Sequence, residues 1–175
     1  MHPLIGRWRV LAVVALLSFG QASLAEEAVK GVFVNAGNSK DVIDKAIDTA
    51  VEKMNFLVAG IARSRLRKTN TLYERIEITN DGAQISVKFD QRQPIVMPAD
   101  GSAVKWTRED GEVFDVSARS AGSQLEQTFR TEEGQRVNHF TLLPQGSLTL
   151  TLDVTVSSPQ LPAPMKYTLN YRAHQ

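Results

Sequence analysis

Alternation of apolar and polar residues along the chain after Asn70 is the feature that most restricts its fold. The clearest runs are 83–89, 148–156 and 165–171, in which leucine, valine, isoleucine or aromatic residues take every second position. Because successive side chains of a strand point to opposite faces, each run has one apolar and one solvated face. This pattern indicates half-buried strands of an antiparallel sheet.

Turn signals separate these runs at intervals of about 8–12 residues or slightly more, which is typical of an antiparallel meander. Most are an acidic residue followed by glycine, as in Asp81-Gly82, Asp100-Gly101 and Asp110-Gly111, and Gln145-Gly146 gives a later turn. The turns predict strands near 72–79, 83–89, 93–97, 103–108, 112–119, 123–131, 135–143, 147–157 and 165–173, and 31–34 is compatible with a short first strand. A sheet of this size closes on itself or wraps around a helix.

One long helix is predicted over 40–67, capped by Asn38 or Ser39. Its apolar positions follow helical spacing, as in Ile43, Ile47, Ala50, Val51, Met54, Leu57, Val58 and Ile61. The segment 54–62 is apolar nearly all round, which predicts burial on more than one side or a break near Gly60. The fold class is therefore α+β and mostly β, with an N-terminal long helix followed by an antiparallel meander closing as a barrel or strongly curved sheet.

The first 25 residues have the pattern of a secretory signal peptide. Arg7 and Arg9 precede a short apolar run, and Ser23 and Ala25 place small residues at the −3 and −1 positions of a cleavage site. The domains are thus a signal peptide at 1–25 and a single helix-plus-β-barrel domain at 26–175. This predicts a periplasmic or secreted protein, with no transmembrane span in the mature chain.

Charge and cysteine content exclude several classes of partner. The chain has 20 basic and 19 acidic residues, and the leader removes two of the basic ones, so a nearly neutral domain remains. Such a domain is not suited to neutralising many phosphates, so no nucleic acid partner is expected. The absence of cysteine excludes disulfides, thiol catalysis and cysteine-ligated zinc. No metal and no cofactor are predicted.

Candidates for catalysis are few. His139 and His174 are the histidines after the leader, and there is no Gly-x-Ser-x-Gly motif for an activated serine. Most of the acidic residues between 90 and 133 fall in or beside the predicted turns, where solvated hairpin tips are the simplest interpretation. The basic run 63–68 reads as the end of a helix, with an anionic headgroup or acidic partner as the alternative. The sequence therefore predicts no enzymatic activity, and an enzyme that uses His139 in a cavity is the least favoured hypothesis.

The interior of the barrel holds the candidate binding site. Alternation assigns a few polar side chains to otherwise apolar faces, which suits an amphiphilic ligand, whereas a filled core would bond these groups to one another. The predicted ligand-binding residues are Trp106, Gln127, Phe129, His139, Leu169 and Tyr171.

The order of these elements resembles the calycins, meaning lipocalins and fatty-acid-binding proteins. The resemblance rests on the hairpin patterns 106–114, 125–129 and 134–138 and on the closing Tyr167-Thr-Leu-Asn-Tyr171. It implies an antiparallel barrel that encloses a ligand. The fatty-acid-binding proteins hold the ligand carboxylate with an Arg-x-Tyr on the last strand, and the corresponding residues here are Leu169-Asn170-Tyr171. The expected ligand is therefore neutral or weakly polar rather than a carboxylate.

Two functional hypotheses from different classes remain. The first is an exported non-enzymatic β-barrel protein that binds a small apolar or amphiphilic ligand. The second is a structural or interaction module of the cell envelope, with a filled barrel, no ligand and an envelope protein partner. An interior void would favour the first hypothesis, and an exposed apolar patch on a filled barrel would favour the second.

Overall fold

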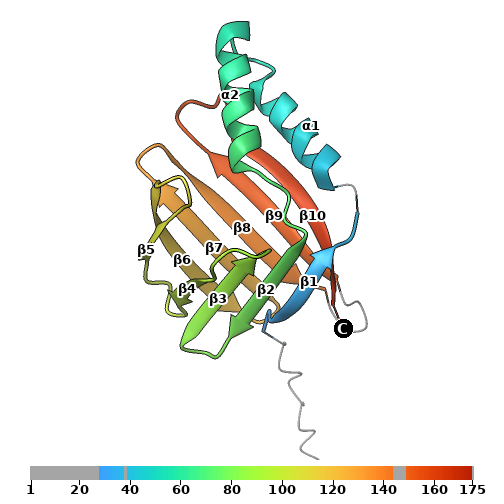
Figure 1. The fold of residues 1–175 in the computed structure, drawn as a ribbon, viewed down its shortest axis with the longest axis vertical. Coiled ribbons are helices and arrows are strands. Elements are labelled where there is room, and N and C mark those ends of the chain that lie inside the picture. Colours follow the sequence, from blue (N-terminus) through green and yellow to red (C-terminus); the bar gives the residue numbers. More distant parts are fainter. Residues whose placement is uncertain (1–27, 38, 144–148, 175) are drawn as a thin grey trace, which may run out of the picture.

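A computed structural model describes residues 28–37, 39–143 and 149–174, and shows a pair of helices inserted after the first strand of a ten-stranded sheet (Figure 1). The elements are β1 (Gly31–Asn35), α1 (Ser39–Val51), α2 (Phe56–Thr69), β2 (Arg75–Asn80), β3 (Gln84–Phe89), β4 (Ile95–Pro98), β5 (Val104–Thr107), β6 (Val113–Ala121), β7 (Gln124–Thr131), β8 (Gly134–Leu142), β9 (Thr149–Ser157) and β10 (Met165–Ala173). The predicted signal peptide, the Asn38 cap and the Gln145-Gly146 turn lie outside the described residues. Within those residues, no helix is long and apolar enough to cross a membrane.

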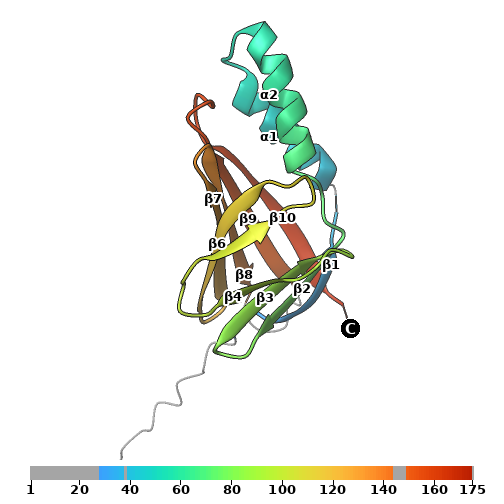
Figure 2. The ribbon, with the colours of Figure 1, turned by 60° about the vertical axis from the view of Figure 1, so that its left-hand side comes forward.

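The strands form one antiparallel sheet in the order β4-β3-β2-β1-β10-β9-β8-β7-β6-β5. The first strand joins the last, because β1 pairs with both β2 and β10. The sheet curls until its edges, β4 and β5, lie near each other without forming a ladder, and β4 packs against β6 (Figures 1 and 2). The predicted meander that closes as a barrel is confirmed, and its strands lie within a few residues of the predicted ranges.

Alternation explains which side chains fill the barrel. On β10, Met165, Tyr167, Leu169 and Tyr171 are buried, and the residues between them are exposed. Leu169 pairs directly with Leu152 on β9, which in turn pairs with Phe140 on β8, so these apolar side chains lie next to one another on the inner face. Burial of this shared face is the main source of stability for the sheet.

The single long helix predicted over 40–67 is wrong, because two helices separated by a turn occupy the segment. The break lies at residues 52–55 and not near Gly60, which is inside α2. Asn55 is the N-cap of α2, and its side chain accepts a hydrogen bond from the Leu57 N–H at 3.0 Å. Asparagine is among the favoured N-cap residues, so Asn55 begins a new helix where it interrupts an apolar run.

The predicted burial of 54–62 on more than one side is also wrong. Phe56, Leu57, Val58 and Ile61 have exposed fractions of 79%, 66%, 51% and 61%. Ala59 and Leu66 are the buried residues of α2, whereas Ile43, Ile47 and Val51 of α1 are all buried. The helices project beyond one end of the barrel, where α1 contacts β10 and α2 contacts α1 (Figures 1 and 2). We call Phe56, Leu57, Val58 and Ile61 the α2 apolar patch.

The basic run near the end of α2 contributes ion pairs between the helices. Arg63 Nε lies 2.7 Å from Asp48 Oδ1, and Arg67 Nε lies 3.2 Å from Asp44 Oδ1. Both pairs use residues spaced by four, which places them on the facing sides of α1 and α2. Exposed ion pairs contribute little to stability, so we assign them to alignment of the helices rather than to their docking.

Replacing Ile47 by aspartate tests the docking of α1. Ile47 is fully buried, so Ile47→Asp places an unpaired charge in the core and should lower the free energy of unfolding by several kcal/mol. Ile61→Asp is the matched control, because the same change at an exposed position of α2 should cost far less. Urea unfolding measures both, and equal midpoints for the two variants would contradict the docked position of α1.

Candidate functional site

A cavity of about 260 Å³ lies at the end of the barrel near the C-terminal end of α2. Its lining comes from that end of α2, from the turns after β3, β5 and β7, and from the end of β9. Ligand pockets usually measure roughly 300–1,000 Å³, so this cavity suits a small ligand or one part of a larger one. We call this end of the barrel the mouth.

Aromatic residues form one wall of the cavity. Trp106 on β5, Phe114 on β6 and Phe129 on β7 all face inward and line it. The ring centroids of Trp106 and Phe129 are 5.7 Å apart, and those of Phe114 and Phe129 are 6.1 Å apart, both with edge-to-face geometry. Such pairs are favourable contacts between aromatic rings, so the wall is an ordered apolar surface.

A chain of polar side chains runs from the interior of the barrel to its mouth. Gln127 Nε2 approaches Met97 Sδ at 3.6 Å, and Asn138 Nδ2 donates to Gln127 Oε1 at 3.1 Å. Arg136 Nε then donates to Asn138 Oδ1 at 2.8 Å, and its Nη1 donates to Asn70 Oδ1 at 3.1 Å. Among the described residues, no buried side-chain nitrogen or oxygen lacks a hydrogen-bond partner. The polar groups that interrupt the apolar interior are therefore satisfied by one another.

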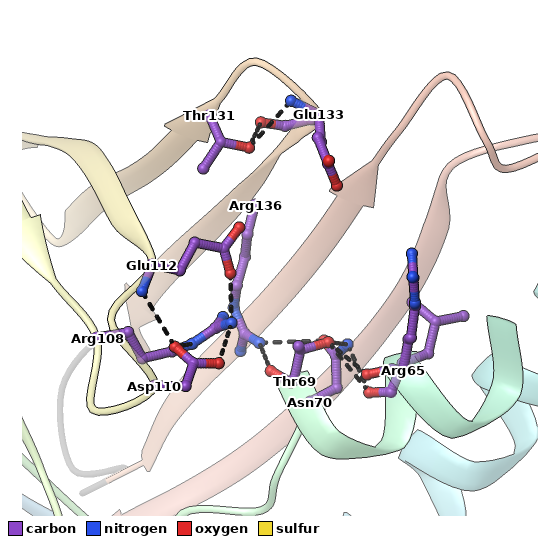
Figure 3. A network of polar contacts seen from close by, with 11 residues as sticks. Arg65, Thr69, Asn70, Arg108, Asp110, Glu112, Thr131, Glu133 and Arg136 are labelled. Carbon is purple, nitrogen blue, oxygen red and sulfur yellow. Dashed lines mark hydrogen bonds and ion pairs between the residues drawn. The ribbon is translucent and has the colours of Figure 1, made fainter. Parts of the chain in front are cut away.

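Asn70 joins this chain to the helices (Figure 3). Its Nδ2 donates to the Leu66 carbonyl at 3.0 Å at the end of α2, while its Oδ1 also accepts from the Tyr167 hydroxyl at 3.1 Å. Burial raises the pKa of Tyr167, and the nearby Arg136 partly opposes that rise. Tyr167 thus remains a neutral donor at physiological pH, and one amide ties α2 to β8 and β10.

Two arginines at the mouth have acidic partners. Arg108 binds Asp110 through Nε at 2.9 Å and Nη2 at 2.8 Å, and it also pairs with Glu112. The hydrogen bonds from Arg108 lower the pKa of Asp110 to about 2. Arg92 Nε lies 3.7 Å from Glu109 Oε1. These pairs neutralise much of the positive charge that the turns bring to the mouth.

The six predicted ligand-binding residues fall into different places. Trp106 and Phe129 line the cavity. Gln127 lies further inside the barrel and accepts a hydrogen bond from Asn138, which lines the cavity. Leu169 and Tyr171 are buried outside the cavity lining. The Tyr171 hydroxyl donates to the Tyr73 carbonyl at 3.0 Å, which makes it an anchor for the segment between α2 and β2.

The prediction that His139 points into the barrel is wrong. Asn138 and Phe140 on either side of it are buried, so His139 lies on the outer face of β8. Its direct partners on the neighbouring strands are Glu126 and Asp153. His139 does not line the cavity, which removes the base that the enzymatic hypothesis requires.

Sequence reasoning missed Asn70 and Arg136, the two residues that organise the polar side of the mouth. Arg136 stands next to Phe129 on β7 and Val156 on β9, on the inner face. The register of β8 with its neighbours is the signal that could have placed Arg136 on the inner face. Asn138 pairs there with Gln127 and Val154, and Arg136 lies two residues before Asn138 on the same face. Asn70 carries no such signal, because it lies in the connection after α2 and contacts residues distant in sequence.

A second hollow of about 660 Å³ lies between α1 and residues 162–167. Its walls come from α1 and a proline-containing loop, and Tyr167 is its one aromatic lining residue. The cavity at the mouth combines an aromatic wall with convergent polar groups, so we take it as the candidate site. Within 28–37, 39–143 and 149–174, no group of three or more histidine or acidic residues is arranged to hold a metal ion.

Comparison with known proteins identifies the fold. No protein-family model matches the chain, and no curated protein matches its sequence. The REP1-NXSQ fatty acid transporter aligns with a TM-score of 0.52 and 13% identity, over 83% of this chain and 96% of that chain. The Schistosoma mansoni fatty acid binding protein in complex with arachidonic acid aligns with a TM-score of 0.51 and 14% identity, over 83% of this chain and 96% of that chain.

Human cRBP IV aligns with a TM-score of 0.50 and 9% identity, over 83% of this chain and 98% of that chain. Identities this low establish the fold alone. The predicted calycin-like β-barrel is therefore confirmed as the architecture of this chain.

Removing the side chain of Asn70 tests the polar junction. Asn70→Ala leaves Arg136 and Tyr167 without a shared acceptor and deletes a cap of α2, so the free energy of unfolding should fall by about 1–3 kcal/mol. Asn80→Ala is the control, because Asn80 makes an exposed turn bond to the Gly82 N–H. Urea unfolding measures the free energy of unfolding of both variants. A loss for Asn70→Ala no larger than that for Asn80→Ala would contradict the role of Asn70 as the junction between α2, β8 and β10.

Proposed function

We propose that this calycin-like barrel is a non-enzymatic protein that binds a small apolar or amphiphilic molecule in the cavity at its mouth. The observation that carries the proposal is the combination of an aromatic wall with a few ordered polar groups around about 260 Å³ of space. Apolar walls supply affinity by removing ligand surface from water, and the polar groups orient the ligand.

The structural neighbours support this proposal. Their names describe fatty acid transport for one and a fatty acid binding protein in complex with arachidonic acid for another. Fold alone does not determine function, so the proposal rests on the cavity and not on these names.

One observation favours a second function, an interaction module of the cell envelope. The α2 apolar patch places four large side chains in solvent at the far end of the molecule. Exposed apolar clusters often mark sites of protein interaction. The burial of Met97, Leu125 and Phe140 on the inner face also supports a filled interior away from the cavity.

We further propose that the chain is exported, to the periplasm or beyond. The basic start, the short apolar run and the small residues Ser23 and Ala25 support removal of residues 1–25 by a signal peptidase. A carrier in that compartment would meet ligands outside the cytoplasm.

A neutral apolar dye tests the binding proposal. N-phenyl-1-naphthylamine should bind the native protein saturably, with an increase in fluorescence as it leaves water for the aromatic wall. Val156→Phe should prevent this, because Val156 is an inward, half-buried residue of the cavity lining. Its melting temperature should change little, because a void accepts added volume.

Val113→Phe is the matched control for Val156→Phe. Val113 is 51% exposed and does not line the cavity, so this variant should bind dye as the wild type does. Absence of dye binding, together with a Val156→Phe variant destabilised by about 1–3 kcal/mol as in an overpacked core, would reject the carrier function. That result would favour the interaction module.

Processing is tested by N-terminal sequencing of the protein exported from a bacterial host. The expected first residue is Glu26, because Ser23 and Ala25 fit the −3 and −1 positions. Ala25→Phe should block cleavage and leave the leader attached. Recovery of wild-type exported protein that starts at Met1 would overturn the proposal.

A further inference from the structure

The hollow of about 660 Å³ is a groove between α1 and the connection from β9 to β10, and we call it the α1 groove. On α1 it is lined by Val42, Ala46, Thr49 and Ala50, which share one side of the helix over roughly 12 Å. Figure 2 shows the helices and that connection diverging above the barrel. An extended polypeptide covers this length with about four residues.

Most of the α1 groove is lined by small or apolar side chains. Ala46 and Ala50 are half-buried, and Val42 is 39% exposed. Tyr167 lies at the base and is held in place by its hydrogen bond to Asn70. These residues offer an apolar floor on which the side chains of a partner can be removed from water.

The wall opposite α1 is stiff. It consists of Pro162, Ala163 and Pro164, all exposed, and the turn before them is closed by the Leu161 N–H, which donates to the Ser158 carbonyl at 3.1 Å. Proline rings fix the backbone φ, so this wall has little freedom to lose when a partner binds. The groove is therefore formed before its occupant arrives.

Three lysines surround the α1 groove, namely Lys45, Lys53 and Lys166. All three are exposed, and none of them forms an ion pair with a residue that the structure describes. Glu52 is the one acidic residue among the described residues of the lining. The groove thus combines an apolar floor with a net positive rim.

Lysines on the sheet are arranged differently. Lys105 Nζ lies 2.8 Å from Asp115 Oδ1, and Lys88 Nζ lies 3.8 Å from Glu77 Oε2. These cations are balanced by carboxylates of the same chain, whereas the positive charge around the α1 groove is not. An occupant with negative charge would supply the missing balance.

The positions of the groove lysines indicate the kind of anion. Lys45 lies on α1, Lys53 in the turn after it and Lys166 on β10. The helix from Lys45 to Val51 alone separates the first two by roughly 9 Å along its axis. The cations are spread along the groove and do not converge on one point, which suits several carboxylates on one chain better than a single small anion.

We propose that the α1 groove is the docking site for an extended acidic segment of a partner protein. Successive side chains of an extended segment point to opposite sides, so apolar ones can lie on Ala46 and Ala50 while carboxylates between them reach the rim. Lysine stems are long enough to follow the occupant and keep the ammonium groups beside its carboxylates. This docking site is separate from the mouth, and the proposal does not depend on ligand binding there.

Fluorescence anisotropy of a rhodamine-labelled peptide tests the proposal on the full chain. The probe is Asp-Leu-Glu-Leu-Glu-Leu, in which carboxylates and leucines alternate. One control peptide, Asn-Leu-Gln-Leu-Gln-Leu, lacks the charge, and the other, Asp-Ser-Glu-Ser-Glu-Ser, lacks the apolar side chains. The probe should bind at least about tenfold more tightly than either control, and added salt should weaken its binding.

Two pairs of variants locate the probe. Removing two groove charges with Lys53→Gln and Lys166→Gln together should weaken binding about fivefold, as expected for two exposed ion pairs. Lys68→Gln with Lys105→Gln removes two exposed charges outside the groove and should leave the affinity within about twofold of the wild type.

Ala46→Trp fills the α1 groove and should abolish binding of the probe. Ser64→Trp is its matched control, because it adds the same side chain at an exposed position of α2 outside the groove. Neither variant touches the mouth, so both should bind N-phenyl-1-naphthylamine as the wild type does. Loss of peptide binding with retained dye binding also shows that the Ala46→Trp variant is folded.

Several results would overturn the proposal and leave the function of the mouth untouched. They are no binding of the probe, equal binding of the probe and either control peptide, affinity that survives Ala46→Trp, and displacement of the probe by the dye. Phosphatidylglycerol vesicles and sedimentation equilibrium test a lipid surface and a second copy of this chain. Vesicle binding or dimerisation that Ala46→Trp abolishes, without binding of the probe, would assign the groove to that occupant instead.

Discussion

The whole architecture depends on one inner face shared by ten strands. Most strands carry apolar side chains at every second position, and pairing in register places these side chains next to one another across the sheet. Curling the sheet removes this face from water. The alternation continues to the ends of the strands, so Gln127, Arg136 and Asn138 also point inward and need polar partners there.

Those partners explain why the end of α2 lies at the mouth. Asn70 is the amide that meets both Arg136 and Tyr167, and it caps α2 at the same time. A polar group without a partner inside the barrel would lower the free energy of unfolding by about as much as several apolar contacts raise it. The helices are therefore restricted to a position from which Asn70 reaches Arg136 and Tyr167. The helices are thus fixed by a polar contact at one end and by the apolar face of α1 along its length.

Prediction from the sequence succeeded where alternation was uninterrupted. β9 and β10 were placed within a few residues, because their inner residues are apolar and the outer ones polar. On β8 the inner row contains Arg136 and Asn138, so Val137, His139 and Thr141 looked like the buried face. Because the inner residues of β8 are polar, its alternation assigns the wrong face to the interior. Only the register of β8 with β7 and β9 identifies the inner face.

Prediction failed in two other places for different reasons. The segment 40–67 has continuous helical spacing, and the single asparagine that begins α2 is too small a signal to separate a cap from a tolerated polar residue. Asn70 and Arg136 are separated by 66 residues, and their contact exists only after the barrel has closed. Alternation alone places Trp106 and Phe129 on the inner face, where both line the cavity, and their contact with a ligand stays a prediction.

The seam between β4 and β5 has a mechanical consequence. Every other pair of neighbouring strands is held by backbone hydrogen bonds, which fix their spacing, but these two edges meet through side chains only. The circumference of the barrel is therefore set by packing at this line and not by a closed ladder. A wall of this kind stretches most easily across its seam, because widening the barrel there breaks no ladder between strands, and the other eight strands can keep their register.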